Sequence, residues 1–516
     1  MNMVRHKFGR SGCTGWRAFN LFLALALLLM FPAAAGPAQA VVPHAQLQLL
    51  QIAADNPMQL VDIIVQKAVS DAGPEALVAA LGGKVTKDLS IINAFAAETT
   101  AGAAAELARA ASVRWVSLDA AIQPAACTDC VDPSKLTNAY IRAIRADKAW
   151  GNSLALQGQG IGVAVVDSGI NPNADLYTVM GVNRQVANVR YNTDYNQNTS
   201  DGYGHGTVVS SIVGGDGSDS GGSYIGVAPR VNIINVKVTN DDGSATASSV
   251  VQGLQWVLEN KATYNIRVVN LSFNSSVPES YQTSPLDAAA EILWFNQIVV
   301  VASAGNQGSG ALYPPANDPF IITVGATDDK GTASLSDDVV ATFSAYGKTS
   351  DGFKKPDLVA PGKNIIGRLV NTNMGMGGAH PANVISNAYF KMSGTSVSAP
   401  IVSGAVALLL QDEPTLNPDQ VKYRLMSTAN KAWTGYSSNK AGAGYLDIYA
   451  AVKGTSTKTA NTGQRASQLL TTGSDPITWG SVGWNSVGWN TVGWNTVGWN
   501  TVGWNTVGWN SDYWGQ

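Results

Sequence analysis

The sequence KMSGTSVSAPIVSGAVALLLQ, residues 391–411, joins a serine-bearing loop directly to an apolar segment. Residues 399–410 are almost all small or aliphatic, which predicts a buried helix. Pro400 suits the first turn of such a helix, because its missing N–H has no intrahelical partner there. Ser396 is therefore expected at or just before a helix N-terminus, where unpaired N–H groups and the helix dipole favour negative charge. That position suits a nucleophile in acyl transfer, although a serine there is more often only a helix cap.

A serine nucleophile needs a base, and the chain has four histidines: His6, His44, His205 and His380. His6 falls in an N-terminal targeting segment, His44 follows that segment, and His380 stands in a glycine-rich, loop-like stretch. His205 has a glycine on each side, which allows close approach, and precedes a stretch that indicates a buried helix. His205 is therefore the candidate base.

A catalytic histidine also needs a group that holds its tautomer. Asp167 follows the apolar stretch 161–166, IGVAVV, which predicts a buried strand. Open α/β sheets place functional groups at the C-terminal ends of such strands. Asp167 is therefore the candidate orienting acid.

The sequence motifs around these residues resemble those of the subtilisin-like serine proteases, and the resemblance extends over residues 140–453. The phrases appear in the family's order: VAVVDSGI around Asp167, GYGHGTVVS around His205, GVAPRVNIINVKV from Gly226, VVNLSF from Val268, VVVASAGNQG from Val299, KPDLVAPG from Lys355 and GTSVSAP around Ser396. The resemblance implies an α/β fold, with a mostly parallel sheet flanked by helices. It also implies a serine endopeptidase that hydrolyses proteins and peptides with an Asp-His-Ser triad.

Further site residues come from the same resemblance. Asn306, which follows the apolar run 298–302, resembles the asparagine that binds the oxyanion together with the backbone N–H of Ser396. Taken alone, a Gly-Asn pair is more often a turn. The family usually has glycine where this chain has Asn274, so a side chain there narrows the space beside a bound peptide. The positions implied to bind substrate are Ser272, Phe273, Asn274, Ala304 and Gly305.

No cofactor is implied for catalysis, but a structural calcium ion is left open. Asp175, Asp216 and Asp219 could supply oxygen ligands to a hard cation. The loop that carries Asp216 and Asp219 differs in detail from the family's usual calcium loop. Solvated turn residues are the alternative interpretation of all three.

Residues 1–40 have the pattern of a secretory signal peptide. Four basic residues within 1–17 precede an apolar stretch over 18–31, and the small residues Ala38-Gln-Ala40 end the segment. We therefore expect a secreted, extracellular protein that is cleaved after Ala40. The apolar core is too short for a stable membrane span, and no other stretch predicts one. The net charge of −3, with 13% charged residues, gives no reason to expect nucleic-acid binding.

Residues 41–130 are expected to form a small α+β domain. The predicted elements are a strand over 60–66, a helix over 74–81, strands over 84–92 and 94–99, a helix over 102–111 and a strand over 113–122. This β-α-β-β-α-β order is that of a ferredoxin-like unit. By position and pattern it resembles the propeptide of the family, which assists folding and inhibits the enzyme until it is cut away. A permanent accessory domain is the alternative.

Cys127 and Cys130 form a CTDC motif near the boundary with the peptidase domain, which is expected over 138–453. In an oxidising compartment a local disulfide is the default for such a pair. A metal site would need more ligands than the sequence shows, and a redox motif would need a thioredoxin-like setting. The sequence leaves the pairing of these two cysteines open.

The C-terminal region has a different composition. Residues 454–478 are rich in Thr, Ser and Gly and predict a flexible linker. Within the tail, residues 479–516, six tandem pentapeptides occupy residues 481–510, SVGWN twice and TVGWN four times. Exposed tryptophan arrays suit the surface of a sugar, a lipid or a protein, and a disordered or self-associating tail is the alternative.

Two other functions compete with a secreted endopeptidase. One is a non-enzymatic surface-binding protein on a protease-like scaffold, which the tail favours. The other keeps the same chemistry in an esterase or a peptide ligase. The complete set Asp167, His205 and Ser396 favours the endopeptidase.

Overall fold

The computed structural model describes residues 44–124, 139–151, 154–177, 181–194, 197–310 and 312–470. All of these residues belong to one compact unit. The predicted signal peptide, the CTDC motif and the pentapeptide tail lie outside the described residues. Below, residues 44–124 are called the small domain and residues 139–453 the large domain.

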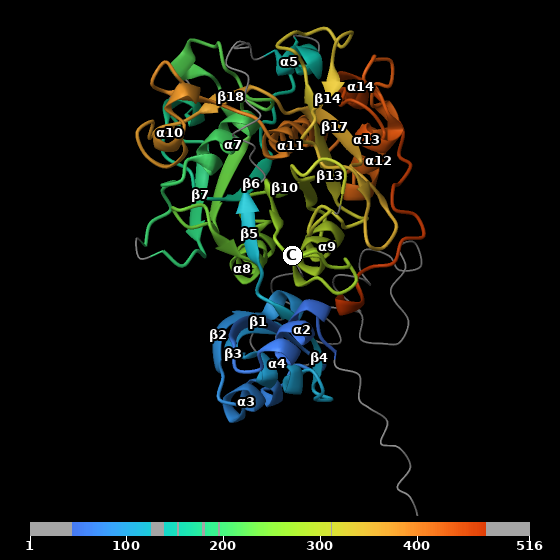
Figure 1. Cartoon of the computed structure of the whole chain (residues 1–516). Coiled ribbons are helices and arrows are strands. Elements are labelled where there is room, and N and C mark those ends of the chain that lie inside the picture. The colour runs from blue at the N-terminus through green and yellow to red at the C-terminus, as the bar shows by residue number, and fades with distance from the viewer. Residues whose placement is uncertain are drawn as a thin grey trace, which may run out of the picture. The chain divides into compact units, whose positions relative to one another are not determined.

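A mostly parallel sheet forms the centre of the large domain (Figure 1). Every neighbouring pair in it is parallel except β13 and β14. Strands β6, β12, β13 and β17 are buried along their whole length, as expected when helices cover both faces of a parallel sheet. The strand order is β14 (Val339–Val340), β13 (Ile322–Asp328), β12 (Val299–Ser303), β10 (Ile266–Leu271), β6 (Gly162–Asp167), β8 (Asn232–Lys237) and β7 (Gln185–Arg190), with β17 (Leu358–Pro361) also paired to β13.

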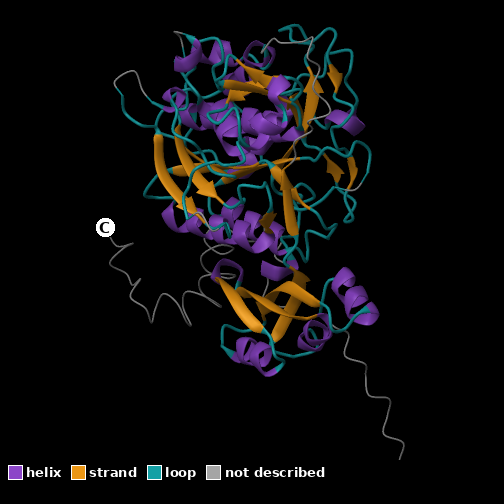
Figure 2. Cartoon of the chain, turned by 60° about the vertical axis from the view of Figure 1, so that its left-hand side comes forward, coloured by secondary structure: helices purple, strands orange, loops and turns teal. Residues whose placement is uncertain are grey.

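Helices lie on both sides of this sheet (Figure 2). Helices α7 (His205–Gly214) and α11 (Thr395–Asp412) contact each other, as do α8 (Ala247–Asn260) and α9 (Pro285–Phe295). All four helices also contact strands of the sheet. The predicted fold, a mostly parallel sheet flanked by helices, is confirmed.

Apart from α12 (Pro418–Thr428), the remaining elements of the large domain are short. The other helices are α5 (Tyr140–Ala143), α6 (Ala146–Trp150), α10 (Gly375–Ala379), α13 (Ser438–Ala441) and α14 (Ile448–Lys453), with 3-10 turns η3 (Ala174–Leu176), η4 (Ser218–Ser220) and η5 (Pro381–Asn383). The strands are β15 (Gly347–Lys348), β16 (Lys354–Lys355), β18 (Ile365–Arg368), β19 (Val384–Ile385) and β20 (Tyr389–Met392).

Helix α11 begins earlier than the sequence indicated. It starts at Thr395, so Ser396 lies inside its first turn and Pro400 lies in its interior. Pro400 has no N–H to donate to the carbonyl of Ser396, four residues earlier. The Ser272 hydroxyl donates to that carbonyl instead, at 2.8 Å. The expectation that Pro400 opens the helix was wrong, because a side chain from elsewhere replaces the missing bond.

Among the described residues, α11 is also the one helix long and apolar enough to cross a membrane. Within that 18-residue window, 89% is buried inside the protein. Its apolar character is therefore explained by the core of the large domain.

The small domain has the predicted β-α-β-β-α-β order. Its antiparallel sheet has the order β2-β3-β1-β4. The elements are β1 (Leu60–Lys67), α3 (Gly73–Ala80), β2 (Lys84–Leu89), η1 (Ser90–Ile92), β3 (Ala94–Thr100), α4 (Ala101–Leu107) and β4 (Val113–Leu118). The sequence analysis missed α2 (Leu47–Asp55), which contacts α4.

The last predicted strand of the small domain is divided in two. The stretch 113–122 was expected to be one strand, but β4 ends at Leu118 and β5 (Ala121–Pro124) leaves the small sheet. Strand β5 pairs on one side with β11 (Phe273–Ser275) and on the other with β9 (Ala245–Thr246), both antiparallel. Strand β5, at the C-terminal end of the small domain, therefore belongs to a three-stranded sheet whose other two strands come from the large domain.

Residues 454–470 differ from the flexible linker that was predicted for 454–478. Arg424, in α12, donates to the carbonyls of Gly454 and Ser456. The segment ends in the 3-10 turn η6 (Gln468–Leu470), in which Leu469 and Leu470 are buried. Composition alone could not show this, because distant side chains bind the backbone of the segment.

Candidate active site

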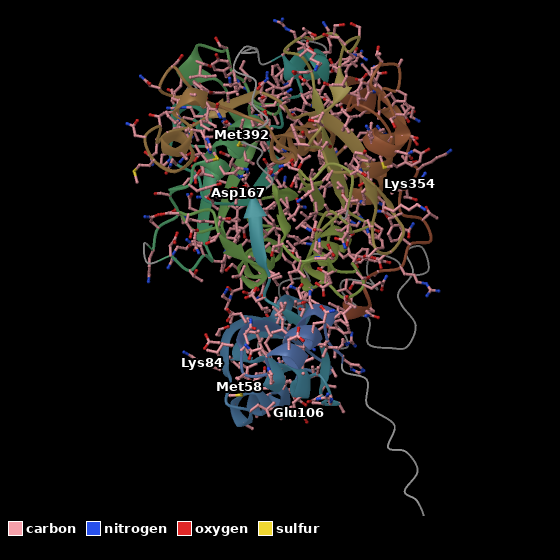
Figure 3. All side chains as sticks on the ribbon, in the orientation of Figure 1. Met58, Lys84, Glu106, Asp167, Lys354 and Met392 are labelled. Atoms are coloured by element: carbon pink, nitrogen blue, oxygen red, sulfur yellow. The ribbon has the colours of Figure 1, made fainter. Side chains whose placement is uncertain are left out.

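Asp167 and His205 form a buried pair at the carboxyl end of the central sheet (Figure 3 labels Asp167). Asp167 is the last residue of β6, and His205 is the first residue of α7. His205 Nδ1 lies 2.8 Å from Asp167 Oδ1, which also accepts the backbone N–H of Ser168 at 2.8 Å. The two residues that the sequence proposed as base and orienting acid are thus in hydrogen-bond contact.

A second buried carboxylate, Asp201, shapes the turn that presents His205. Its Oδ1 accepts the Ser168 hydroxyl at 2.8 Å and the Gly204 N–H at 2.6 Å. Its Oδ2 accepts both the N–H and the hydroxyl of Thr207, at 2.8 Å and 2.6 Å. Asp201 therefore binds the start of α7 as a helix cap does. The sequence analysis missed it, although it stands four residues before His205.

The electrostatic surroundings of His205 favour its charged form. Burial by itself lowers the pKa of His205, but the charge and hydrogen bond of Asp167, together with the charge of Asp201, outweigh burial and raise this pKa. An imidazole in such surroundings accepts a proton more readily than a free histidine does. That property suits a general base.

Ser396 lies in the first turn of α11 and is fully buried. Helix α11 contacts α7, the helix that begins with His205. Within the described part of the chain, Ser396 Oγ and His205 Nε2 have no hydrogen-bond partner. These are the two atoms between which a proton would move during nucleophilic attack, and such contacts are often long in the absence of substrate.

The amide of Asn306 is held beside Ser396 by the neighbouring residue, Thr395. Asn306 Oδ1 accepts the Thr395 N–H at 2.9 Å and the Thr395 hydroxyl at 3.1 Å. The Gly305 N–H donates to the same hydroxyl at 3.0 Å. Because the oxygen is held toward Thr395, the amide nitrogen points away from it. Thr395 thus fixes the orientation of the Asn306 amide, and the sequence analysis did not single it out although it lies in the GTSVSAP motif.

The predicted substrate-binding residues follow the carboxyl ends of two adjacent strands. Ser272 to Asn274 come after β10, and Ala304 and Gly305 come after β12. Asn274 Nδ2 donates to the Ser303 carbonyl at 2.9 Å, and the side chain is buried. A methyl group built on Gly305 would lie 3.3 Å from Asn274 Oδ1. The Asn274 side chain therefore lies beside Gly305, as does Gln307 Oε1, which is 2.6 Å from the same methyl position.

Strand β5 of the small domain lies along these residues as an extended peptide. Gln123 pairs with Asn274, and Pro124 pairs with Phe273. On its other edge, Ala121 and Ile122 pair with β9. A peptide bound by strand addition on both edges is fixed through its backbone, whatever its side chains.

The three predicted calcium ligands do not form a metal cage. Asp175 accepts the Asp219 N–H and the Tyr389 hydroxyl, each at 2.8 Å. Asp219 Oδ2 pairs with Arg368 Nε at 2.7 Å, and Asp216 accepts the N–H and hydroxyl of Ser218. No group of three metal-ligating side chains suited to a metal ion occurs in the described ranges. Protein donors bind all three carboxylates, as the alternative interpretation of turn residues expects, and the calcium site stays a prediction.

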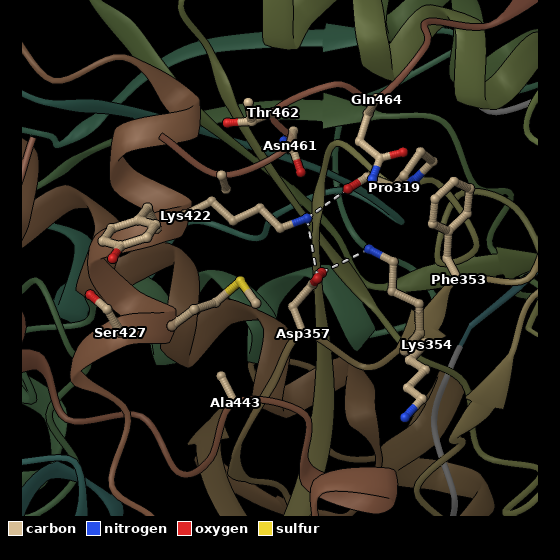
Figure 4. A pocket seen from close by; sticks show the side chains of 14 residues that line it. Pro319, Phe353, Lys354, Asp357, Lys422, Ser427, Ala443, Asn461, Thr462 and Gln464 are labelled. Atoms are coloured by element: carbon tan, nitrogen blue, oxygen red, sulfur yellow. Dashed lines mark hydrogen bonds and ion pairs between the residues drawn. The ribbon is translucent and has the colours of Figure 1, made fainter. Parts of the chain in front are cut away.

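A cavity of about 430 Å³ lies elsewhere, lined by residues of the large domain and of the segment 460–464 (Figure 4). Lys355 and Lys422 both pair with Asp357 beside it, at 2.7 Å and 3.1 Å. Lys422 also donates hydrogen bonds to three backbone carbonyls, so its buried ammonium group has several acceptors. None of the candidate catalytic residues lines this cavity.

Comparisons with known proteins show what the chain is similar to. Residues 158–444 match the model of the subtilase family, Peptidase_S8. The chain is 37% identical over 329 residues to serine protease AprX of Bacillus subtilis, covering 62% of this chain and 72% of AprX. It is 32% identical over 317 residues to subtilisin DY of Bacillus licheniformis, covering 61% of this chain and 97% of that protein.

One solved structure supports the fold alone. Fervidolysin from Fervidobacterium pennivorans, a keratinolytic enzyme related to subtilisin, is similar with a TM-score of 0.58 at 24% identity. The match covers 78% of this chain and spans 62% of the fervidolysin chain.

Proposed function

The chain belongs to the subtilase family of serine proteases, and from this premise we propose that it is a secreted endopeptidase that its own small domain inhibits until that domain is cut away. Membership of the family makes the chain a serine endopeptidase. The catalytic residues, the control by the small domain and the export are the proposed parts. The buried pair Asp167–His205, at the end of the strand next to β10, supports the catalytic part of the proposal, and the pairing of β5 with the large domain supports the inhibition.

In the proposed reaction, Ser396 Oγ attacks the carbonyl carbon of the scissile peptide bond. His205 Nε2 takes the hydroxyl proton and later gives it to the leaving amine, which produces an acyl-enzyme that water then hydrolyses. Asp167, bonded to Nδ1, keeps the proton on that nitrogen and stabilises the imidazolium that forms. The Asn306 amide and the Ser396 N–H stabilise the oxyanion at the positive end of α11.

The small domain, with residues 41–130 as its proposed extent, acts as the propeptide. Pairing of β5 with β9 and β11 supports this role, because a substrate would have to add its own strand between the same two edges. While β5 occupies that position, a protein substrate cannot bind there. Cleavage after β5 and release of the small domain would free both edges.

Localisation and surface binding rest on the sequence alone. Residues 1–40 are proposed to direct secretion, and the tryptophan-rich tail, residues 479–516, to contact a surface. Both lie outside the described residues. The protein and peptide substrates of the enzyme, and its own small domain as inhibitor, are its proposed partners.

A serine-reactive fluorophosphonate tests the assignment of the nucleophile. We expect the processed enzyme to be labelled on Ser396, and the His205→Ala variant, freed of its small domain by an added protease, to remain unlabelled because the hydroxyl lacks its base. A label on another residue, with peptide hydrolysis intact, would overturn the assignment. Turnover of a matched peptide amide and ester by the same sample separates an endopeptidase from an esterase.

A further inference from the structure

The end of the described chain, residues 465–470, is fixed on the large domain. The Tyr281 hydroxyl donates to the Arg465 carbonyl at 2.9 Å. The Ser467 N–H donates to Glu291 Oε2 at 2.7 Å, and the Ser467 hydroxyl to the Gln282 carbonyl at 2.9 Å. Ser467 is fully buried. These residues, called the clasp below, are therefore an ordered part of the surface around the start of α9.

The segment that precedes the clasp, residues 461–464, is itself bound to the large domain. Asn461 donates to Asp419 Oδ1 at 2.6 Å and to the Phe320 carbonyl at 3.0 Å. Asn461, Thr462 and Gln464 line the cavity beside Lys422 (Figure 4). Because these contacts precede the clasp, its position is set by the large domain.

The small domain binds the clasp from the other side. Gln66, in β1, donates through Nε2 to the Leu469 carbonyl at 2.8 Å. Arg114, in β4, donates through one guanidinium nitrogen to the carbonyls of Gln468 and Leu469, each at 3.3 Å. Strands β1 and β4 are neighbours, with Gln66 opposite Trp115. Both strands thus donate a hydrogen bond to the Leu469 carbonyl, and β4 also donates one to the Gln468 carbonyl.

We propose that the clasp, residues 465–470, is part of the surface that holds the small domain, so that a segment beyond the peptidase domain contributes to inhibition. This inference rests on the proposed function of the small domain as a propeptide. The donors come from the small domain and the acceptors are backbone carbonyls, so the contact requires the clasp to be in place rather than a particular side chain at 468 or 469. The charged guanidinium of Arg114 bonds to two carbonyls at 3.3 Å, and the neutral amide of Gln66 bonds to one at 2.8 Å, so both residues contribute to the contact.

Arg114 is the better residue to change. Gln66 Nε2 also donates to the Ile92 carbonyl within the small domain, so its loss would disturb that domain as well. Arg109 offers a matched control, because it is an exposed arginine of the small domain that pairs with Glu106 of the same domain. Arg114→Ala and Arg109→Ala remove the same side chain from two different surroundings.

The experiment follows the full chain as it activates itself. After the first cleavage, peptide hydrolysis starts only when the small domain is released, so the lag before full activity measures how tightly it is held. We expect Arg114→Ala to shorten the lag at least threefold and Arg109→Ala to leave it unchanged. Truncation after Gly463 should shorten the lag similarly, and truncation after Leu470 should not.

The combination of the two changes decides the inference. Arg114→Ala in a chain truncated after Gly463 should give no further shortening, because the acceptors of Arg114 are already gone. Equal effects of Arg114→Ala with and without the clasp, or an unchanged lag in Arg114→Ala alone, would overturn the inference. Should the truncated chain fail to fold, Arg114→Ala against Arg109→Ala still decides it. If the unaltered chain showed no cleavage and no lag, the propeptide role itself would be wrong, which is a separate outcome.

Discussion

The hydroxyl of Ser272 donates a hydrogen bond of 2.8 Å to the backbone carbonyl of Ser396. That carbonyl lacks a helical partner because residue 400 is proline. Ser272 in turn accepts the Asn270 amide at 2.8 Å, and Asn270 accepts the Ser403 hydroxyl at 2.9 Å. A chain of three buried hydrogen bonds therefore runs from the middle of α11, through the end of β10, back to the first turn of the same helix.

Replacing Ser272 with alanine should impair both stability and catalysis. The buried carbonyl of Ser396 would lose its donor, which costs about 1–3 kcal/mol. The backbone that carries the nucleophile would be less well fixed, so we expect kcat/KM on a short peptide to fall about tenfold. Ser398→Ala is the matched control, because that buried hydroxyl of α11 bonds to carbonyls of 360 and 361 instead. Thermal unfolding and peptide hydrolysis should show similar destabilisation in both variants but a loss of kcat/KM only in Ser272→Ala. Equal kinetic losses would contradict this role.

The acid limb of the pH–rate profile should lie above pH 6.5. Burial opposes the charge on His205, but Asp167 and Asp201 raise its pKa above the ordinary value. The general base works only when neutral, so activity must fall as the pH drops through this raised pKa. The measurement is kcat/KM of the processed enzyme from pH 5 to 9. A limb at or below pH 6.5 would show that the carboxylates do not stabilise the imidazolium.

Asn274 should restrict the enzyme to small residues before the cleaved bond. Its side chain bonds to the Ser303 carbonyl and lies against Gly305, so it takes space that a large substrate side chain would need. We expect Asn274→Gly to raise kcat/KM for peptides with leucine or phenylalanine at this position about tenfold or more relative to alanine. Ser275→Ala, one residue farther along β11, is the control. An unchanged peptide-library profile in Asn274→Gly would place the selecting residue elsewhere.

The loop that was expected to bind calcium should be stabilised by Arg368 instead. Arg368 pairs with Asp219 at 2.7 Å and donates to the carbonyls of Leu369 and Ala388. Arg368→Ala should lower the free energy of unfolding by about 1–3 kcal/mol, because these acceptors lose their donor. Treatment of the unaltered protein with EDTA should leave its Tm unchanged. A Tm that falls with EDTA and recovers only with added calcium would show that a metal stabilises the protein.

Local sequence could predict Asp167 and His205, because each is next to a continuous apolar segment of the chain. Asp167 ends a strand whose apolar residues are adjacent in the chain, and His205 begins a helix whose apolar residues follow it directly. The signals for both are therefore within a few residues. The parallel sheet was predictable for the same reason, since its buried strands are short continuous apolar runs.

The parts that sequence reasoning missed depend on partners far away in the chain. The helix start at Thr395 is compatible with Pro400 only because Ser272, 124 residues earlier, supplies a donor. Strand β5 leaves the small sheet because two edges of the large domain bind it, and residues 454–470 are ordered because distant side chains bind their backbone. Secondary-structure propensity and composition depend only on residues that are close together in the chain. Contacts between distant residues therefore leave no signal in the local sequence.

The most direct measurement of the central claim is the N-terminal sequence and intact mass of the purified chain, compared between the unaltered protein and Ser396→Ala. Gln123 pairs with Asn274 and Pro124 with Phe273, the residue next to Ser272, whose hydroxyl bonds to the Ser396 carbonyl, so we expect the cut just beyond β5. We predict that the unaltered enzyme cuts itself after Ala125, a residue outside the described ranges. Ser396→Ala, with a loss of about 10⁶ in kcat, should retain the small domain uncut. Equal trimming of pure Ser396→Ala, with no other protease present, would contradict the account.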